Sequence, residues 1–492
     1  MLKKLLALLS DAAIYGVSNA LSQLINLFLL PLFTAYLTKS DYGMMGRLTM
    51  FAAVYSPLAN LGMTNAIYRR YNTDKQEAQR NETLSTGLIS VVCSSLFLLA
   101  ACQLAAEPLS GFIFGKEGQT QIVRLAFVSA ALVQIGTVPL VVLRASRRVK
   151  TIAGLNVAKL LFSISASIWF VVIQEMGVLG YVIGLLIADI VFVVIQYSMI
   201  ARAFRFLASW SVWKRMLAYG LPFVPHHLQA AVLYQFGEYM TGNMLGLGEA
   251  GLYSMATKFA LPVGFVVSAV NTAWGPYKFQ IHADDENPAA FFRTAVTFYC
   301  TGIFYLWVGV SIWGPELLRL MTTAEFHPAA ALVPMVALIP VSQGLFFMFG
   351  TGIEMSDNTR AMPLISLIGL ATVVVTAFGL IPLLGMQGAA LSTASGWLLM
   401  AVTAFFLAQR RFAISYDWRT VAALLLLAVA CFGLAYLCRD LAPGPRIAAA
   451  LGLSLAYPML AIMILLRSET ERGRIHILWN RVRRQTPNAV AP

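Results

Sequence analysis

Long apolar segments recur from one end of the chain to the other, and they limit the fold more than any other feature. Hydrophobic residues make up 59% of the 492 residues and charged residues only 12%, and the mean hydropathy is +0.74. A soluble domain carries about 25% charged residues. Because a water-soluble fold could not bury this much apolar surface, the sequence predicts an all-α polytopic membrane protein.

The apolar segments have the length of membrane-spanning helices, which need about 20 predominantly apolar residues. The sequence predicts about fourteen spans, near residues 12–37, 42–68, 83–105, 121–145, 150–174, 178–201, 216–245, 250–279, 290–314, 328–353, 361–383, 387–409, 418–438 and 445–466. Prolines interrupt the seventh and tenth spans. Neighbouring helices or water must satisfy the backbone carbonyls that these prolines free.

The 35 Lys and Arg residues are concentrated in alternate connections. With the N-terminus inside, the pairs Arg69-Arg70, Arg147-Arg148 and Arg410-Arg411 all fall on the inner side. The positive-inside rule therefore predicts an even number of spans with both termini cytoplasmic. The basic tail after Arg467 is expected to lie along the anionic inner leaflet.

Residues 36–71, which we predict to form one long helix, share a pattern with residues 244–263 about two hundred residues later. The matched pairs are Asp41/Glu249, Gly43/Gly251, Thr49/Thr257, Phe51/Phe259 and Ala52/Ala260. Six helices is an even number, so the copies run in the same direction, as in a parallel repeat about an axis along the membrane normal. The predicted domains are a first six-helix half (1–205), a second six-helix half (206–412), an additional two-helix hairpin (413–467) and a basic cytoplasmic tail (468–492). The function is expected to lie between the halves.

Several of these stretches resemble one family of membrane proteins. Residues 37–71, LTKSDYGMMGRLTMFAAVYSPLANLGMTNAIYRRY, resemble the second helix of bacterial Wzx-type polysaccharide flippases, of the multidrug/oligosaccharidyl-lipid/polysaccharide exporter superfamily. Residues 219–262 resemble the seventh and eighth helices of that family. Residues 273–277 resemble the segment that follows its eighth helix, and residues 326–330 resemble the segment that precedes its tenth. The resemblance covers roughly residues 10–410. In one departure, many members have an Asp-Arg pair midway along the seventh helix, where this chain has Gly237-Glu238.

The resemblance implies a flippase of the cell inner membrane that moves an undecaprenyl-pyrophosphate-linked oligosaccharide to the outer leaflet by alternating access, for lipopolysaccharide or exopolysaccharide synthesis. The implied partners are this lipid-linked substrate, membrane lipids and a polysaccharide polymerase or export complex. No nucleic acid partner is expected, because the net charge of +13 follows the topology. No cofactor is expected either, because the chain lacks a G-x-x-x-x-G-K-[ST] motif and its five cysteines have no metal-ligand spacing.

Charged residues inside spans are candidate functional residues, because each costs at least about 2.5–3.5 kcal/mol at a helix centre. Lys159 and Asp189 share a depth on the hairpin of the fifth and sixth spans, where we expect them to pair. The pair is either a structural ion pair or a coupling-ion site. Glu238 and Lys258 likewise share a depth on the next hairpin. Glu238 is either an ion-binding carboxylate or half of a structural salt bridge.

The implied pyrophosphate substrate favours a cationic cavity that contains Arg47, Lys159 and Lys258. The alternative for Arg47 is that its side chain snorkels to the outer headgroups. Amides add a second set of candidates. Asn19, Gln23 and Asn26 fall on one face of the first span and are predicted to line the cavity, although an amide equally joins helix to helix in lipid.

Three further expectations concern the inner ends of helices. His226 and His227 are expected to belong to a solvated helix end. Glu354 and Asp357 are expected to pair with Arg360. Trp274 and Tyr277 are expected to lie in the aromatic belt at the membrane surface, with stacking on a sugar as the alternative.

Three other functions compete with the flippase hypothesis. A cation-coupled multidrug exporter of the same superfamily resembles only the first twelve helices, so the extra pair counts against it. A peptidoglycan-precursor flippase would also have fourteen helices. An enzyme such as a glycosyltransferase, polymerase or ligase needs a sizeable outer loop with carboxylates or arginines, whereas the predicted outer connections are short. The sequence therefore favours a transporter, not an enzyme.

Overall fold

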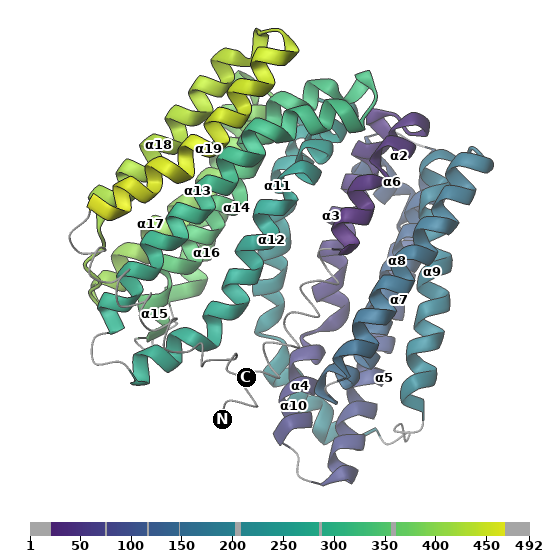
Figure 1. Ribbon diagram of the computed structural model, residues 1–492. Helices are drawn as coiled ribbons and strands as arrows, with labels where there is room; N and C mark the ends of the chain where they lie inside the picture. Colours follow the sequence, from purple (N-terminus) through teal and green to yellow (C-terminus); the bar gives the residue numbers. More distant parts are fainter. Residues whose placement is uncertain are drawn as a thin grey trace, which may run out of the picture. The chain divides into compact units, whose positions relative to one another are not determined.

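Helices make up most of the described part of the chain. The computed structural model describes residues 21–73, 76–115, 118–146, 148–201, 208–284, 288–355 and 361–467. No strand occurs in these ranges, and the helices are labelled in Figure 1. Eleven segments among the described residues are long and apolar enough to cross a membrane. The predicted all-α polytopic membrane fold is thereby confirmed.

Three of the fourteen predicted spans are not among the eleven. The first, near residues 12–37, lies partly outside the described residues. The other two are present as α3 (Lys39–Asn60) and α11 (Phe223–Met244), each 22 residues long. Both have the length of a span but are less apolar than the eleven. These two helices, which also pack against each other, are therefore the natural place to look for polar function.

The prediction of one long helix over residues 36–71 is wrong. The chain forms α2 (Leu30–Tyr36), α3 and α4 (Met63–Thr73) instead. A capping box begins α3, in which the Thr38 side chain accepts from the Asp41 amide while the Asp41 carboxylate accepts from the Thr38 amide. Leu61 and Gly62 end it, with left-handed φ angles of 51° and 71°. Glycine is required at position 62 for a second reason, since a Cβ there would overlap the Gly220 carbonyl oxygen.

The seventh predicted span is also divided. An amphipathic helix, α10 (Trp210–Gly220), precedes Leu221 and Pro222, and α11 follows them. Because Pro222 lacks an amide hydrogen, the hydrogen-bond ladder is interrupted where the two helices join. Gly220 and Gly62 lie in backbone contact, so the breaks before α4 and before α11 face each other.

The described helices belong to two compact units. The first unit comprises residues 1–258, 321–328 and 373–393. Besides the helices above, it contains α5 (Glu77–Leu104), α6 (Ala106–Phe114), α7 (Thr120–Ala145), α8 (Val149–Ile168) with its π-helical end η1 (Trp169–Ile173), α9 (Gly177–Ile200) and the start of α12 (Leu247–Asp284). Within it α7 packs against α5 and α9, and α8 packs against α9. Its apolar core has one cluster around Ile67 and Met216 and another around Tyr55 and Phe127.

The second unit comprises residues 259–320, 329–372 and 394–492. It contains parts or all of α12, α13 (Pro288–Met321), η3 (Ala324–Leu332), α14 (Val333–Phe349), α15 (Thr351–Met355), α16 (Met362–Leu384), α17 (Met386–Gln409), α18 (Trp418–Leu437), η5 (Cys438–Asp440) and α19 (Pro443–Arg467). The helices α18 and α19 lie side by side, in yellow in Figure 1. The two predicted six-helix halves stay a prediction, because the units are defined by contacts between residues and their bounds do not coincide with those of the repeat.

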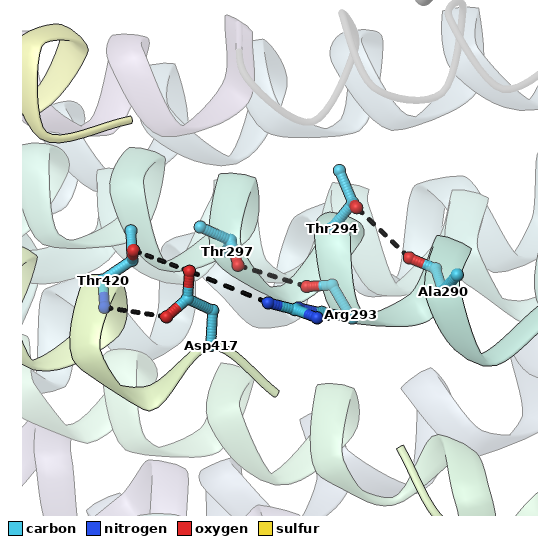
Figure 2. Close-up of polar contacts among 6 residues, drawn as sticks. All are labelled: Ala290, Arg293, Thr294, Thr297, Asp417 and Thr420. Atoms are coloured by element: carbon cyan, nitrogen blue, oxygen red, sulfur yellow. Dashed lines mark hydrogen bonds and ion pairs between the residues drawn. The ribbon is translucent and has the colours of Figure 1, made fainter. Parts of the chain in front are cut away.

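The α18–α19 pair is attached to α13 at both ends. Towards the outer end predicted from the sequence, Arg446 Nη2 lies 3.0 Å from Glu316 Oε2, and Trp313 Nε1 donates to Ser454 Oγ over 3.0 Å. At the other end, shown in Figure 2, Asp417 caps α18 by accepting from the amide and the hydroxyl of Thr420. Arg293 of α13 lies 3.9 Å from the same carboxylate. The extra pair is thus a fixed part of the second unit.

Candidate functional site

The site is built where α3, α11 and the first turns of α12 meet, all within the first unit. The matched glycines of the repeat bring these helices together. A Cβ on Gly43 would overlap the Leu247 carbonyl oxygen and lie 3.2 Å from the Gly251 amide nitrogen. A Cβ on Gly251 would overlap the Lys39 carbonyl oxygen and lie 3.0 Å from the Gly43 amide nitrogen. The contact is reciprocal, as expected where two copies of one motif meet about a two-fold axis.

A carboxylate from α11 occupies the space between the two copies. Glu238 is only 8% exposed and lies against Gly46 of α3, where a Cβ would overlap its Oε1 atom. Ser254 of α12 is a second polar neighbour of the carboxylate. Gly46 and Ser254 each follow their matched glycine by three residues. Glu238 therefore lies near equivalent positions of the two matched segments.

Glu238 is incompletely satisfied. Its Oε1 atom is buried without a hydrogen-bond partner among the described residues. Lys258 is close enough to interact electrostatically with it, but the described residues contain no ion pair between the two within 4.0 Å. The Lys258 ammonium lies instead 5.7 Å from the centre of the Tyr42 ring. Both interpretations of Glu238, as an ion-binding carboxylate and as a structural partner of Lys258, stay predictions. A buried carboxylate oxygen without a partner is energetically costly.

Gly237, which precedes Glu238, lies in a crowded position. A Cβ on Gly237 would lie 2.5 Å from Thr393 Oγ1 and 2.9 Å from the Tyr253 hydroxyl. A side chain at this position would therefore displace one of these groups.

Arg47 is buried and bonded to protein atoms. It is 3% exposed. Its Nη1 atom donates to the Ile113 carbonyl of α6, and its Nη2 atom donates to Asn243 Oδ1 of α11 over 2.8 Å. The Tyr239 ring centre is 5.7 Å away. The alternative of snorkelling is wrong, since the guanidinium joins α3 to α6 and α11. Substrate binding by Arg47 stays a prediction.

The expected pairing of Lys159 with Asp189 is confirmed. Lys159 Nζ lies 2.6 Å from Asp189 Oδ1, with 33% and 5% of the two side chains exposed. Ser129 of α7 donates to the other carboxylate oxygen. The three side chains join α7, α8 and α9 near the middle of the helices. The structural and the coupling-ion interpretation both remain open.

The predicted amide face of the first span is only partly visible. Asn19 lies outside the described residues, whereas Gln23 is half-buried and Asn26 is exposed. Neither Gln23 nor Asn26 forms a hydrogen bond in the part of the chain that the structure describes. Their predicted role in a cavity stays a prediction.

Of two expectations about inner helix ends, both in the second unit, the pairing with Arg360 stays a prediction and the one for Trp274 needs correction. Glu354 pairs with Lys278 of α12, while Asp357 and Arg360 lie outside the described residues. Trp274 is buried rather than in an aromatic belt, and its Nε1 atom donates to Thr351 Oγ1 over 2.9 Å. Lys278 is not among the candidate residues that the sequence indicates. Its role was missed because it depends on a helix more than seventy residues away.

Sequence reasoning also missed the residues that shape the Glu238 environment. The sequence around Gly46, Ser254 and Asn243 has no composition that would mark these residues as part of a site. The repeat did contain a signal, since extending the match of Gly43 with Gly251 by three residues gives Gly46 and Ser254. No such signal exists for Asn243, whose partner Arg47 is 196 residues away.

Comparison with known proteins gives one family match. The family model described as "Polysaccharide biosynthesis protein" matches residues 33–331. No curated protein matches the chain in sequence.

Solved structures share the fold at low sequence identity. "Lipid II flippase MurJ, inward closed conformation" aligns with a TM-score of 0.72 and 14% identity over 92% of this chain and 100% of that one. An inward-facing multidrug resistance MATE family transporter of the MOP superfamily aligns with a TM-score of 0.62 and 14% identity, over 79% of this chain and 94% of that one. A MOP superfamily transporter from Pyrococcus furiosus Vc1 (DSM3638) aligns with a TM-score of 0.52 and 15% identity, over 82% of this chain and 95% of that one.

Proposed function

The chain belongs to the polysaccharide biosynthesis protein family, and we propose that it is a flippase for undecaprenyl-pyrophosphate-linked oligosaccharides. It moves the glycan from the inner to the outer leaflet of the cell inner membrane by alternating access, with both of its termini cytoplasmic. The fold shared with a lipid II flippase supports transport rather than synthesis. A polysaccharide polymerase or export complex is its proposed partner.

The observation that carries the proposal is the pairing of α3 with α11. They are the two helices of span length that are too polar to match the other eleven, and they pack against each other. They carry Arg47, Glu238 and Asn243 where lipid would exclude such groups. Polar groups at membrane depth are tolerated inside protein or along a path that contains water. A carrier of a polar glycan requires such a path.

Lys258 is the cation best suited to the pyrophosphate. It is half-buried and has no carboxylate within ion-pair distance among the described residues. Arg47 already donates to two protein acceptors, and Lys159 is paired with Asp189. A cation that forms no direct salt bridge attracts an anionic ligand at a lower cost, because no existing salt bridge must be broken.

The proposal is tested by following a fluorescent undecaprenyl-pyrophosphate oligosaccharide across proteoliposome membranes. The wild type is compared with Lys258→Ala and Lys258→Arg, and with Lys214→Ala as a control on the exposed face of α10. We expect transport by the wild type and the control, loss of most transport in Lys258→Ala, and partial recovery in Lys258→Arg.

Other outcomes would point to other functions. Movement of a peptidoglycan precursor alone would favour a peptidoglycan-precursor flippase. Extrusion of cationic dyes without glycan movement would favour a multidrug exporter. Glycan transport that is unchanged in Lys258→Ala would retain the flippase and reject Lys258 as its phosphate ligand.

A further inference from the structure

A second group of chemically useful side chains lies at the opposite end of the α3–α11 pair from Gly43. Here Gly62 and Gly220 approach each other reciprocally, since a Cβ on either would overlap or crowd the carbonyl oxygen of the other. The contact brings α4 next to the junction of α10 and α11, again within the first unit. The distribution of Lys and Arg predicts that this end is the inner one.

Five side chains from these helices form a continuous row, which we call the aromatic row. The Arg69 guanidinium lies 4.5 Å from the Tyr219 ring centre. Tyr219 lies 5.5 Å from Phe223, and Phe223 is stacked on His227 at 6.4 Å with an interplanar angle of 26°. Asn65 Nδ2 lies 3.3 Å from His227 Nε2 and ends the row. The three rings recur every four residues, so they share one face across the α10–α11 junction.

The row remains accessible. Arg69 and His227 are exposed, while Asn65, Tyr219 and Phe223 are half-buried. Among the described residues no carboxylate pairs with Arg69. Its flat face is held by Tyr219, and its five N–H donors lie in the plane of the group, where a ligand can reach them.

This combination matches the chemistry of a phosphorylated sugar. A guanidinium binds phosphate oxygens bidentately. Ring faces pack against the apolar C–H face of a sugar, and an amide with an imidazole can donate to and accept from its hydroxyls. A solvated helix end, which we expected for His227, would need neither the aligned rings nor the Asn65 contact.

We propose that the aromatic row is the subsite that first engages the phosphate-linked sugar of the lipid-linked glycan on the inner side. Arg69 holds the phosphate, Tyr219 and Phe223 lie against the sugar, and Asn65 with His227 binds its hydroxyls. This proposal rests on the flippase function proposed above and names the part of the substrate that is recognised there.

Binding is measured on the full-length protein in neutral-lipid nanodiscs. The probe is farnesyl-pyrophosphate-linked N-acetylglucosamine, which is short enough to titrate from solution. Arg69→Gln removes the phosphate ligand and should weaken binding about tenfold, the usual effect of losing a hydrogen bond to a charged group. Phe223→Leu removes one ring and should weaken it roughly threefold to tenfold.

Matched variants separate binding from damage to the fold. Lys214 is also an exposed cation stacked on a ring, 5.3 Å from that of Trp210, but it lies outside the row. Lys214→Gln should therefore bind like the wild type, and Phe223→Tyr should retain binding because it keeps the ring. Unchanged affinity in both Arg69→Gln and Phe223→Leu would overturn the subsite.

Two competition arms identify the source of the phosphate. Equal binding of a soluble nucleotide sugar, or displacement of the probe by phosphatidylglycerol in the nanodisc, would overturn a subsite for the lipid-linked glycan. The transport assay is run in parallel with the same variants. If the wild type transports glycan and Arg69→Gln binds and transports normally, the subsite is rejected and the flippase function is retained. If the wild type moves no glycan, the flippase function itself is rejected.

Discussion

Gly46 illustrates how an absent side chain determines where a charge can lie. The Glu238 carboxylate occupies the volume that a Cβ at position 46 would fill. The equivalent residue of the second copy, Ser254, supplies a polar neighbour instead of space. The two positions therefore contribute differently to one buried carboxylate, although they belong to the same repeated motif.

Replacing Gly46 with alanine should displace Glu238 and lower stability by about 1–3 kcal/mol, the usual cost of overfilling a packed interior. Gly154→Ala in α8 is the matched control, because a Cβ there meets no atom within 4 Å. Thermal unfolding of the two variants in detergent measures the difference. Equal melting temperatures would mean that Glu238 moves aside without cost.

Helices of this protein are joined by polar links that sequence periodicity does not reveal. Lys159, Asp189 and Ser129 connect three helices of the first unit, and Arg293 with Asp417 connects α13 to α18 in the second. The first link was predictable, because two opposite charges at one depth on neighbouring spans have few alternatives in lipid. The second was not, because Arg293 and Asp417 are far apart in sequence and lie at the ends of their helices.

Asp189→Asn should leave the Lys159 charge without a full partner. The loss should be smaller than the roughly 3–5 kcal/mol of a fully buried pair, because a third of the Lys159 side chain is exposed. A double-mutant cycle with Lys159→Met measures the coupling between the two residues. We expect the neutral double variant to be more stable than Asp189→Asn.

The same double variant decides between the two interpretations of the pair. If the pair is structural, proteoliposome transport should persist once both charges are removed together. Loss of transport in a double variant with a normal melting temperature would instead show that the pair has a functional role, in ion coupling by Asp189 or in substrate binding by Lys159.

Asp417→Ala should weaken the start of α18 by about 1 kcal/mol, the usual effect of removing an N-cap. It also removes the carboxylate that faces Arg293 (Figure 2). Hydrogen exchange should increase in the first turn of α18. Asp440→Ala, which affects an exposed pair with Arg439, is the control that should leave this exchange unchanged.

The fold class could be predicted almost entirely from hydropathy, because in lipid only helices and closed barrels satisfy every backbone group. Eleven spans were therefore found from length and composition alone. The helix breaks at Gly62 and Leu221 could not be found this way, because they depend on the contact between Gly62 and Gly220. Of the candidate site, the charged residues were predicted, but which of them pair was decided by packing.

The predicted topology can be tested on the whole protein with single cysteines in a cysteine-free background. Gln79→Cys in the first turn of α5 should be protected from a membrane-impermeant maleimide in intact cells, because the positive-inside rule predicts it to be cytoplasmic. Glu107→Cys in α6, on the other side, should be labelled. Both side chains are exposed in the fold, so the reverse labelling pattern would mean an inverted protein.

The reciprocal contact of Gly43 with Gly251 has a consequence for the ancestry of the chain. If the repeat arose by gene duplication, the motif met its own copy in a homodimer before the genes fused, and any substitution there appeared twice at one contact. A side chain at this position would then have met a carbonyl oxygen at both contacts, as a Cβ on Gly43 or on Gly251 does in the present fold. After fusion each copy could change alone, so that Gly46 and Ser254 diverged and a single carboxylate, Glu238, could be accommodated between them.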